Sequence, residues 1–503
     1  MLFNSYVFIF LFLPITASVF AILGAYVHRN AALVWLIACS LFFYGYWNPR
    51  YVPLIVGATI VNYLLGNFWL LRANAPARKT ALVLGLIFNL GLLAYFKYAN
   101  LLVDSFNAVA GTQVHLHRII LPLAISFFVF QKIAFLVDSY RGNRGGRNFL
   151  EFFLFVTFFP QLIAGPIVRP HEMLPQLRRR AVLGVSAKNL SIGLTLFVLG
   201  LAKKVLIADP VAPTASRFFD TAAHPANHAG ALSFTTAWLG VLAYTVQIYF
   251  DFSGYSDMAI GLARIFGVRL PINFNSPYKA VNIIDFWRRW HITLSRVLRD
   301  YLYIPLGGNR RGRVRRYANL LVTMLLGGLW HGANWTFVCW GGLHGLYLIV
   351  NHAWHALRTK LGYPPARSIA ESSTLGRLIA KTVTFLAVVI AWVFFRADDF
   401  HAAGRMLAAM AGRLGSGFDQ LSSMRSTLIW VIALLGVAFT MPNSQQIMRW
   451  ARPALGIFPP RASQSRRIWQ WGPEPLWALG VAAVAIVAVL HMSRPSEFVY
   501  YQF

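Results

Sequence analysis

Long apolar runs dominate this sequence, and many reach or approach the roughly 20 residues that a helix needs to cross a bilayer. They occupy approximately residues 5–26, 31–48, 51–71, 80–96, 119–139, 189–208, 231–250, 378–395, 426–443 and 475–492. Only 12% of the 503 residues are charged, whereas a soluble globular protein carries about 25%. The sequence therefore predicts an all-α, multi-pass membrane protein with one membrane domain over residues 1–503.

Two further apolar segments are interrupted. Gly165 and Pro166 interrupt residues 152–168, and the surroundings of His331 interrupt residues 317–354. Broken apolar helices are tolerated in a membrane only where they line a buried or water-filled cavity. Both segments are thus expected to form walls of a site, with Gly165-Pro166 and Gly327-Gly328 shaping its narrow part.

The charge of the chain is strongly positive, with 46 Lys and Arg against 16 Asp and Glu. By the positive-inside rule, basic loops are expected to face the cytoplasm. A positive charge could also indicate binding to nucleic acid, but the apolar runs argue against that partner. The loops concerned contain Arg72, Arg78 and Lys79; Arg141, Arg144 and Arg147; and Arg178, Arg179 and Arg180. Residues 264–316 form a basic cytoplasmic or interfacial region that suits anionic lipids or an anionic substrate, and residues 209–230 are expected to form an external loop.

His331 lies in the apolar stretch LGGLWHGANW, between Gly328 and Gly332. An ionisable side chain at membrane depth is costly and usually functional. An imidazole with an ordinary pKa near 6.5 suits general-base catalysis, in which it removes the proton of a hydroxyl that attacks an acyl carbonyl. His291 and Asn334 are candidates for holding the acyl oxygen or orienting this base.

Residues 283–301 have the periodicity of one amphipathic helix. Its polar stripe contains Arg288, His291, Ser295 and Arg299. A helix lying on anionic lipid would show the same stripe, and His291 could equally be a structural histidine.

Asp251 and Asp257 stand at the end of an apolar run, where Gly254 and Ser256 predict a break in the helix. These carboxylates fit structural ion pairs with arginine and could also orient a histidine. His344, His352 and His355 follow His331, but no Asp or Glu lies between Trp330 and Ala356. Because carboxylates are common partners of histidine in di-metal sites, no metal or tightly bound cofactor is expected.

Several long motifs resemble the membrane-bound O-acyltransferase family, and within it the bacterial alginate O-acetyltransferase branch. They are FNSYVFIFLFLP, ISFFVFQKIAFLVD, FFPQLIAGPIVRP, QIYFDFSGYSDMAIGLARIFG, FWRRWHITLSRVLRDYLYIPLGGNR and TMLLGGLWHGANWTFVCWGGLHG. The resemblance implies a bundle of about 11–12 spanning helices around a central funnel, with re-entrant or broken helices. It makes His331 the catalytic histidine and His291 the second important polar position.

The resemblance also implies a reaction. An acetyl group from a cytoplasmic donor, most simply acetyl-CoA, would cross a bacterial inner membrane for O-acetylation of an exopolysaccharide such as alginate or cellulose. Periplasmic SGNH-type acetyltransferases are the implied partners. Substrate contacts are expected at Arg288, Arg289, Ser295, Arg299, Asn334 and Asp251, with the arginines facing the phosphates of the donor.

Other functions remain compatible with the sequence. A transporter or flippase for an acidic or lipid-linked sugar would also use a basic face and broken helices, although the two matching halves of an inverted repeat are not evident. The chain could be a scaffold whose partner performs the chemistry. A relative of the same architecture transfers D-alanine, so another acyl group is a further alternative.

Overall fold

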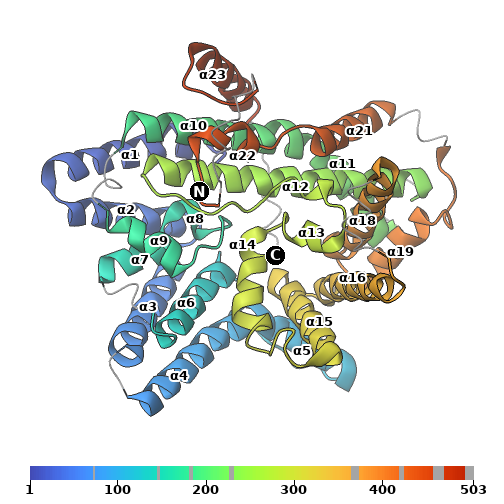
Figure 1. The fold of residues 1–503 in the computed structure, drawn as a ribbon, viewed down its shortest axis with the longest axis horizontal. Coiled ribbons are helices and arrows are strands. Elements are labelled where there is room, and N and C mark those ends of the chain that lie inside the picture. Colours follow the sequence, from blue (N-terminus) through green and yellow to red (C-terminus); the bar gives the residue numbers. More distant parts are fainter. Residues whose placement is uncertain are drawn as a thin grey trace. The chain divides into compact units, whose positions relative to one another are not determined.

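The computed structural model describes residues 1–71, 74–143, 148–179, 185–225, 232–363, 373–418, 424–456 and 469–492 (Figure 1). Arg72, Arg144, Arg147 and Arg180, which were used to assign the cytoplasmic side, lie outside the described residues. The described secondary structure is helical apart from one isolated β-bridge between Pro271 and Leu455. The predicted all-α class is confirmed.

The chain forms two compact units. The first unit contains Met1–Ala202, Gly254–Ile272 and residues 444–492. Its α-helices are α1 (Leu13–Ile22), α2 (Arg29–Gly45), α3 (Val52–Leu64), α4 (Ala75–Leu93), α5 (Ala99–Ala110), α6 (Ile125–Tyr140), α7 (Phe149–Thr157), α8 (Phe159–Leu162), α9 (Pro170–Leu177), α10 (Ala187–Ala202), α22 (Ser444–Ile447) and α23 (Pro475–Leu490).

The second unit contains Lys203–Ser253 and Asn273–Asn443. Its helices are α11 (Asp209–Ala223), α13 (Ile283–Trp287), α14 (Ile292–Leu298), α15 (Gly312–His331), α16 (Trp335–Lys360), α18 (Thr374–Arg396), α19 (Phe400–Met410) and α21 (Arg425–Thr440). Helix α12 (Phe234–Ile265) has residues in both units.

Five helical stretches among the described residues are long and apolar enough to cross a membrane. They are Phe8–Val27, Pro49–Leu70, Ala75–Ala110, Ala187–Ala223 and Thr374–Arg396. Shorter apolar helices cover Arg29–Gly45, Arg425–Thr440 and Pro475–Leu490. The chain is thus a multi-pass membrane protein, while the expected count of 11–12 spans and the central funnel stay predictions.

One expected loop is helical over most of its length, and one expected helix break is absent. Residues 209–223, expected in an external loop, are helical and continue α10 through the π-helical segment Lys203–Ala208. Helix α12 runs without a break past Gly254 and Ser256. Within the first unit, a Cβ added at Gly200 would lie 2.5 Å from the Gly254 carbonyl oxygen. Gly254 therefore lies where α10 and α12 approach closely, as small residues permit in membrane helices.

The interruption of residues 152–168 is confirmed, although it starts earlier than Gly165. Helix α7 ends at Thr157, the short α8 follows, and α9 begins only at Pro170. Phe158, between α7 and α8, has φ −51° and ψ 108°, which is not helical. A Cβ at Gly165 would lie 2.5 Å from the Cα of Gln161, so this glycine packs against backbone.

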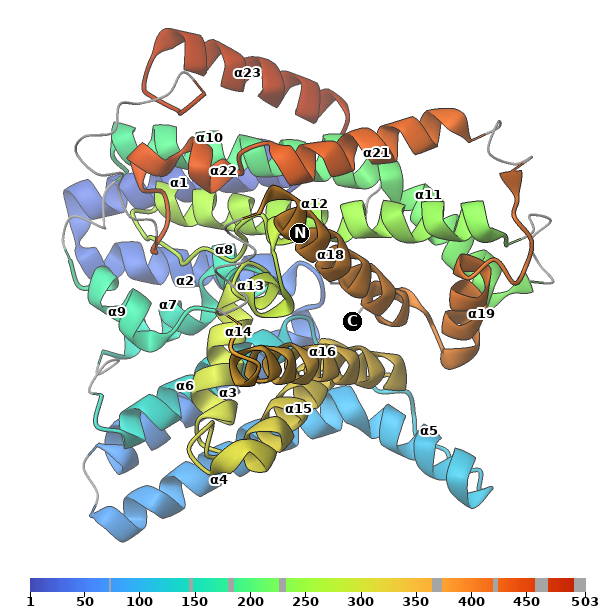
Figure 2. The same cartoon turned by 45° about the vertical axis from the view of Figure 1, so that its right-hand side comes forward.

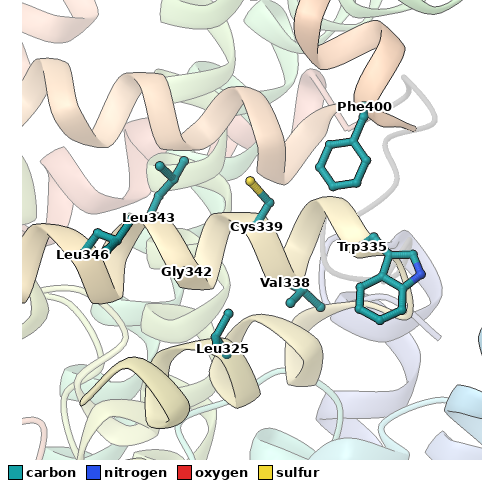
Figure 3. Close-up of a pocket in the computed structure, with 8 residues that line it drawn as sticks. All are labelled: Leu325, Trp335, Val338, Cys339, Gly342, Leu343, Leu346 and Phe400. Atoms are coloured by element: carbon teal, nitrogen blue, oxygen red, sulfur yellow. The ribbon is translucent and has the colours of Figure 1, made fainter. Parts of the chain in front are cut away.

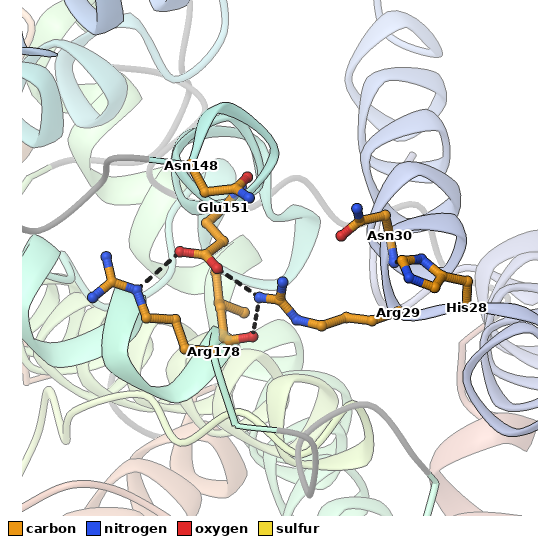
Figure 4. A network of polar contacts seen from close by, with 7 residues as sticks. His28, Arg29, Asn30, Asn148, Glu151 and Arg178 are labelled. Atoms are coloured by element: carbon orange, nitrogen blue, oxygen red, sulfur yellow. Dashed lines mark hydrogen bonds and ion pairs between the residues drawn. The ribbon is translucent and has the colours of Figure 1, made fainter.

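A buried carboxylate joins three segments of the first unit (Figure 4). Glu151 lies in the first turn of α7, where the Asn148 side chain caps the helix. Its two carboxylate oxygens accept from Arg29 at 2.6 Å and from Arg178 at 3.1 Å, and Arg29 also donates to the Leu177 carbonyl. The start of α2 and the end of α9 are thereby held to α7.

Helices α15 and α16 pack side by side as a hairpin in the second unit (Figure 2). A Cβ at Gly328 would lie 2.1 Å from the Phe337 carbonyl oxygen, and one at Gly341 would lie 2.2 Å from the Met324 carbonyl oxygen. Glycine at both positions lets the two backbones nearly touch. At the far end, Arg316 donates to His352 Nδ1 at 2.8 Å. Gly328 therefore shapes helix packing, whereas the sequence had suggested the wall of a passage.

Candidate active site

His331 is the last residue of α15, and the chain leaves the helix at Gly332 in an extended conformation. Its side chain is buried, and three aromatic rings surround it with centroids 5.0–5.2 Å from the imidazole. They belong to Trp330 of α15, Trp340 of α16 and Phe395 of α18. The expected break at His331 is confirmed, and the break places the imidazole where three helices of the second unit meet.

His291 lies between α13 and α14, which Figure 1 shows as two short helices. Its backbone adopts φ 41° and ψ 53°, the left-handed conformation, which costs a non-glycine residue on the order of 1–3 kcal/mol. The predicted single helix over residues 283–301 is therefore wrong, because the chain turns sharply at this histidine. The turn also takes His291 off the predicted polar stripe and buries its side chain completely.

The two histidines come together in the structure. The ring centroids of His291 and His331 are 6.1 Å apart, with an angle of 63° between the ring planes. Trp330 contacts both rings, and Phe252 of α12 packs edge-on against His291 with centroids 4.9 Å apart. The pair of imidazoles thus lies among aromatic rings, and imidazole is the side chain most often used for general acid–base catalysis.

Asn273 is the polar partner that the sequence did not reveal. Its Oδ1 accepts hydrogen bonds from the backbone nitrogen and the hydroxyl of Thr293, at 3.3 and 2.8 Å, and lies 3.1 Å from His291 Nδ1. The backbone carbonyl of Asn273 accepts from Ile292 N at 3.0 Å. Burial lowers the pKa of His291 to about 3, so the ring is neutral. No periodic pattern marks Asn273, which lies in irregular chain before α13.

The side chains of Asn334 and Ser295 form hydrogen bonds with backbone groups in this structure, and no hydrogen bond to either histidine is observed among the described contacts. The Asn334 side chain caps α16 by accepting from Thr336 N and donates to the Asp398 carbonyl at 2.6 Å. Ser295 Oγ donates to the Trp290 carbonyl at 3.5 Å. Asparagine is a favoured N-cap because its oxygen accepts from the orphan N–H groups of the first turn. Their expected contacts with substrate stay predictions.

The three candidate arginines lie on the exposed side of this segment. Arg288 and Arg299 are exposed, and Arg299 forms an ion pair with Asp300 at 2.6 Å. Arg289 is half-buried, pairs with Asp285 at 2.8 Å and donates to the Asn275 carbonyl. Arg288 and Arg299 are therefore more accessible to an anionic substrate than Arg289.

Asp251 belongs to a buried ion cluster of the second unit. Lys204 Nζ lies 2.8 Å from Asp251 Oδ1 and 2.9 Å from Asp209 Oδ1. The side chain of Asp251 is 1% exposed. The structural role in an ion pair, one of the two considered from the sequence, is therefore observed, but its partner is a lysine rather than an arginine. Asp257 likewise accepts from Ser444 and Gln445 within the first unit.

A third buried histidine extends the aromatic enclosure along α16. His344 is fully buried, and its ring lies 4.8 Å from Trp340, which in turn contacts His331. The Tyr347 ring lies 5.7 Å from the His344 ring, centroid to centroid. Tyr347 also lines a half-open cavity of about 530 Å³ between α16, α18 and the start of α13. Asn351, His355 and Arg358 add polar groups to this cavity, and Ile379 and Val383 of α18 add apolar ones.

A second, shallower groove has a different character (Figure 3). It is lined by apolar side chains and by Cys339 around Gly342 of α16. Its lining residues are Leu325, Trp335, Val338, Cys339, Gly342, Leu343, Leu346 and Phe400. The groove has almost no polar surface and is suited to hydrocarbon rather than to proton transfer.

Sequence comparison bears directly on this arrangement. The pattern of the membrane-bound O-acyltransferase family matches residues 41–389, which include both histidines, Asn273 and the α15–α16 hairpin. This chain belongs to the membrane-bound O-acyltransferase family. It is therefore a multi-pass membrane enzyme of the O-acyltransferase class.

Individual members of this family are similar over most of the chain. A peptidoglycan O-acetyltransferase of Helicobacter pylori is 44% identical over 457 residues, covering 85% of this chain and 83% of the relative. A probable alginate O-acetylase of Pseudomonas putida is 39% identical with full coverage of both chains. A teichoic acid D-alanyltransferase of Streptococcus thermophilus is 28% identical over 57% of this chain and 70% of the relative.

Proposed function

We propose that this enzyme is a polysaccharide O-acetyltransferase of the bacterial inner membrane. It transfers an acetyl group from cytoplasmic acetyl-CoA for attachment to hydroxyls of an extracytoplasmic polysaccharide. The observation that carries the proposal is the buried pair His291 and His331, with ring centroids 6.1 Å apart. The two most similar relatives above, named for peptidoglycan and for alginate, support acetyl as the group and a polysaccharide as the final acceptor.

The reaction needs a positioned base and no redox step. One imidazole of the pair, assigned to His331, removes the proton of the attacking hydroxyl. The hydroxyl oxygen forms an ester bond with the acetyl carbon, the carbon–sulfur bond breaks, and the thiolate of the donor takes up the proton. A positioned base of this kind contributes typically about 10²–10⁴-fold to the rate.

The donor is proposed to approach through the cavity between α16, α18 and the start of α13. Arg358 and His355 line this cavity together with apolar residues of α18. This combination fits a molecule with phosphates at one end and a less polar thioester arm. Exposed Arg288 and Arg299 provide further positive charge on the segment that leads to His291. Guanidinium groups bind phosphate with strong, charge-assisted hydrogen bonds.

The acceptor is proposed to be either a sugar hydroxyl or a hydroxyl on a periplasmic SGNH-type partner that completes the transfer. In either case, the attacking group is a hydroxyl bound next to the same two histidines. The competing D-alanyl transfer uses the same chemistry with a different acyl group and is supported by the more distant Streptococcus thermophilus relative.

Purified protein in nanodiscs with radiolabelled acetyl-CoA tests the proposal. Time-dependent release of free CoA, with label entering an oligosaccharide or a partner protein, is the expected result. A flippase would move lipid-linked sugar without consuming thioester, and a scaffold would do neither. If the protein consumes a D-alanyl thioester but not acetyl-CoA, the proposed acetyl donor is wrong, although the protein is still an O-acyltransferase.

A further inference from the structure

Asn273 contacts three consecutive residues of the sharp turn that carries His291. Its side-chain oxygen accepts from the N–H and hydroxyl of Thr293 and faces His291 Nδ1 at 3.1 Å. Its main-chain carbonyl accepts from Ile292 N. Asn273, His291 and Thr293 are all at most 1% exposed. One asparagine therefore holds both the left-handed backbone of the turn and the imidazole that projects from it.

The identity of the Asn273 atom follows from its partners. A backbone N–H can only donate, so the amide atom that meets Thr293 N is the oxygen and not the nitrogen of the side chain. An amide oxygen can only accept, so His291 Nδ1 must carry a hydrogen in order to bond to it. A neutral imidazole carries one ring hydrogen. The lone pair of His291 therefore lies on Nε2.

We propose that Asn273 is a positioning residue that holds His291 in the Nδ1–H tautomer and so makes it a proton acceptor through Nε2. This inference rests on the proposed catalytic use of the two histidines. It excludes one of the roles considered for His291, because a neutral ring whose single N–H bonds to Asn273 has no donor for the acyl oxygen. His291 instead accepts a hydrogen bond, from the substrate hydroxyl or from the neighbouring imidazole.

The surroundings of His291 are compatible with a fixed neutral ring. Phe252 of α12 and Trp330 of α15 pack against it, and the titratable His331 ring lies 6.1 Å away. Asn273 and Thr293, its polar neighbours, are uncharged. The tautomer matters for the reaction, because in the other tautomer Nε2 of His291 carries a hydrogen and cannot accept one from the substrate hydroxyl or from His331.

Two variants separate positioning from simple packing. Asn273→Asp keeps an oxygen for all three donors and adds a negative charge, whereas Asn273→Leu keeps similar bulk and removes the acceptor. Asn319→Leu is the matched control, because Asn319 is also buried in the second unit and its side-chain nitrogen donates to the Gly308 carbonyl, away from the histidine pair.

The first readout is independent of activity. In protein labelled with ¹⁵N-histidine and reconstituted in nanodiscs, the His291 signal is identified by its absence in His291→Gln. We expect a protonated Nδ1 and an unprotonated Nε2 in the wild type, and the same tautomer in Asn319→Leu. An Nε2–H signal for His291 in the wild-type protein overturns the inference, whether or not acetyl-CoA proves to be the donor.

The second readout is kinetic. Asn273→Leu should lower kcat by roughly 100-fold or more with little change in the KM for acetyl-CoA. Asn273→Asp should retain the tautomer and raise the pKa of His291 through the added charge. Its activity should therefore be recovered at alkaline pH and lost earlier on acidification. Wild-type kcat in Asn273→Leu contradicts the inference. If that variant fails to fold, the wild-type NMR signal and the pH profile of Asn273→Asp still test the proposed role of Asn273.

Discussion

His291 and His331 reach the same enclosure from opposite kinds of local structure, with ring centroids 6.1 Å apart. His331 ends a regular helix of 20 residues, whereas His291 occupies a left-handed turn between helices of five and seven residues. The regular element fixes one ring by helix packing, and the irregular element fixes the other through hydrogen bonds that Asn273 accepts. Variants that disturb the helix packing around His331 should therefore differ in effect from variants that remove the hydrogen bonds around His291.

His331→Ala should abolish acetyl transfer while leaving the protein folded. The expected loss of kcat is roughly 100-fold or more, because a positioned base contributes about 10²–10⁴-fold. Release of CoA from labelled donor measures it, with size-exclusion profile and melting temperature as checks on folding. His401→Ala on α19, an exposed position, is the control and should keep wild-type activity. Wild-type polymer acetylation by His331→Ala would remove this residue from the mechanism.

His291→Ala combined with His331→Ala tests whether the two imidazoles act as a unit. Residues that act together give strongly non-additive losses, so the double variant should be about as slow as the slower single variant. Single-turnover rates with acetyl-CoA provide the comparison. If the logarithmic losses simply add, the histidines serve separate steps and the paired geometry has no mechanistic meaning.

Asp251→Asn should act mainly on stability. It removes one of two carboxylates that neutralise the buried ammonium of Lys204, and breaking a buried ion pair costs roughly 3–5 kcal/mol when one partner is lost. The second carboxylate, Asp209, should reduce this to about 2–3 kcal/mol, measurable as a lower melting temperature. Asp398→Asn should change little, because this exposed carboxylate lies 3.7 Å from Arg396 and exposed charges contribute little to such pairs. A raised KM at unchanged stability would instead place Asp251 at the substrate.

Gly328→Ala should force α15 and α16 apart. The added Cβ would lie 2.1 Å from a backbone carbonyl oxygen of Phe337, which cannot rotate away. Because His331 follows one turn later on α15, both melting temperature and kcat should fall. Gly436→Ala in α21 has no heavy atom within 4 Å of the new Cβ, and there alanine should be neutral or stabilise by up to about 1 kcal/mol. Equal behaviour of the two variants would contradict the tight hairpin.

Arg358→Gln should raise the KM for acetyl-CoA about tenfold with little change in kcat. Arg358 lines the 530 Å³ cavity, and a hydrogen bond to a charged group contributes roughly 1.5–3 kcal/mol. Lys360→Gln, on the same helix but outside the cavity lining, controls for general charge. Unchanged KM in Arg358→Gln would direct the donor away from this cavity and toward Arg288 and Arg299.

The sequence predicted well what depends on regular patterns. Apolar runs identify the membrane class, and the glycines and polar residues around His331 mark the break between α15 and α16. The same reasoning misread Gly254 as a helix break, because a glycine that permits close helix approach looks identical in sequence. It also placed His291 on a polar helix face, since periodicity assumes that the helix continues through the residue.

Asn273 and Lys204 were beyond such reasoning for another reason. Their roles depend on residues far along the chain, Thr293 and Asp251, which meet them only after folding. The available signal for Lys204 was weak but present, as a lysine within an apolar stretch needs a buried counter-charge. For Asn273 no comparable signal exists, because an asparagine in an irregular segment is ordinary.

The left-handed backbone at His291 has a consequence for engineering this enzyme. Glycine, asparagine and aspartate adopt that conformation most readily, so replacements that relieve the turn also delete the imidazole. A selection for expression yield alone would favour such replacements and accumulate well-behaved, inactive protein. Libraries that include position 291 therefore need a screen for turnover from the first round.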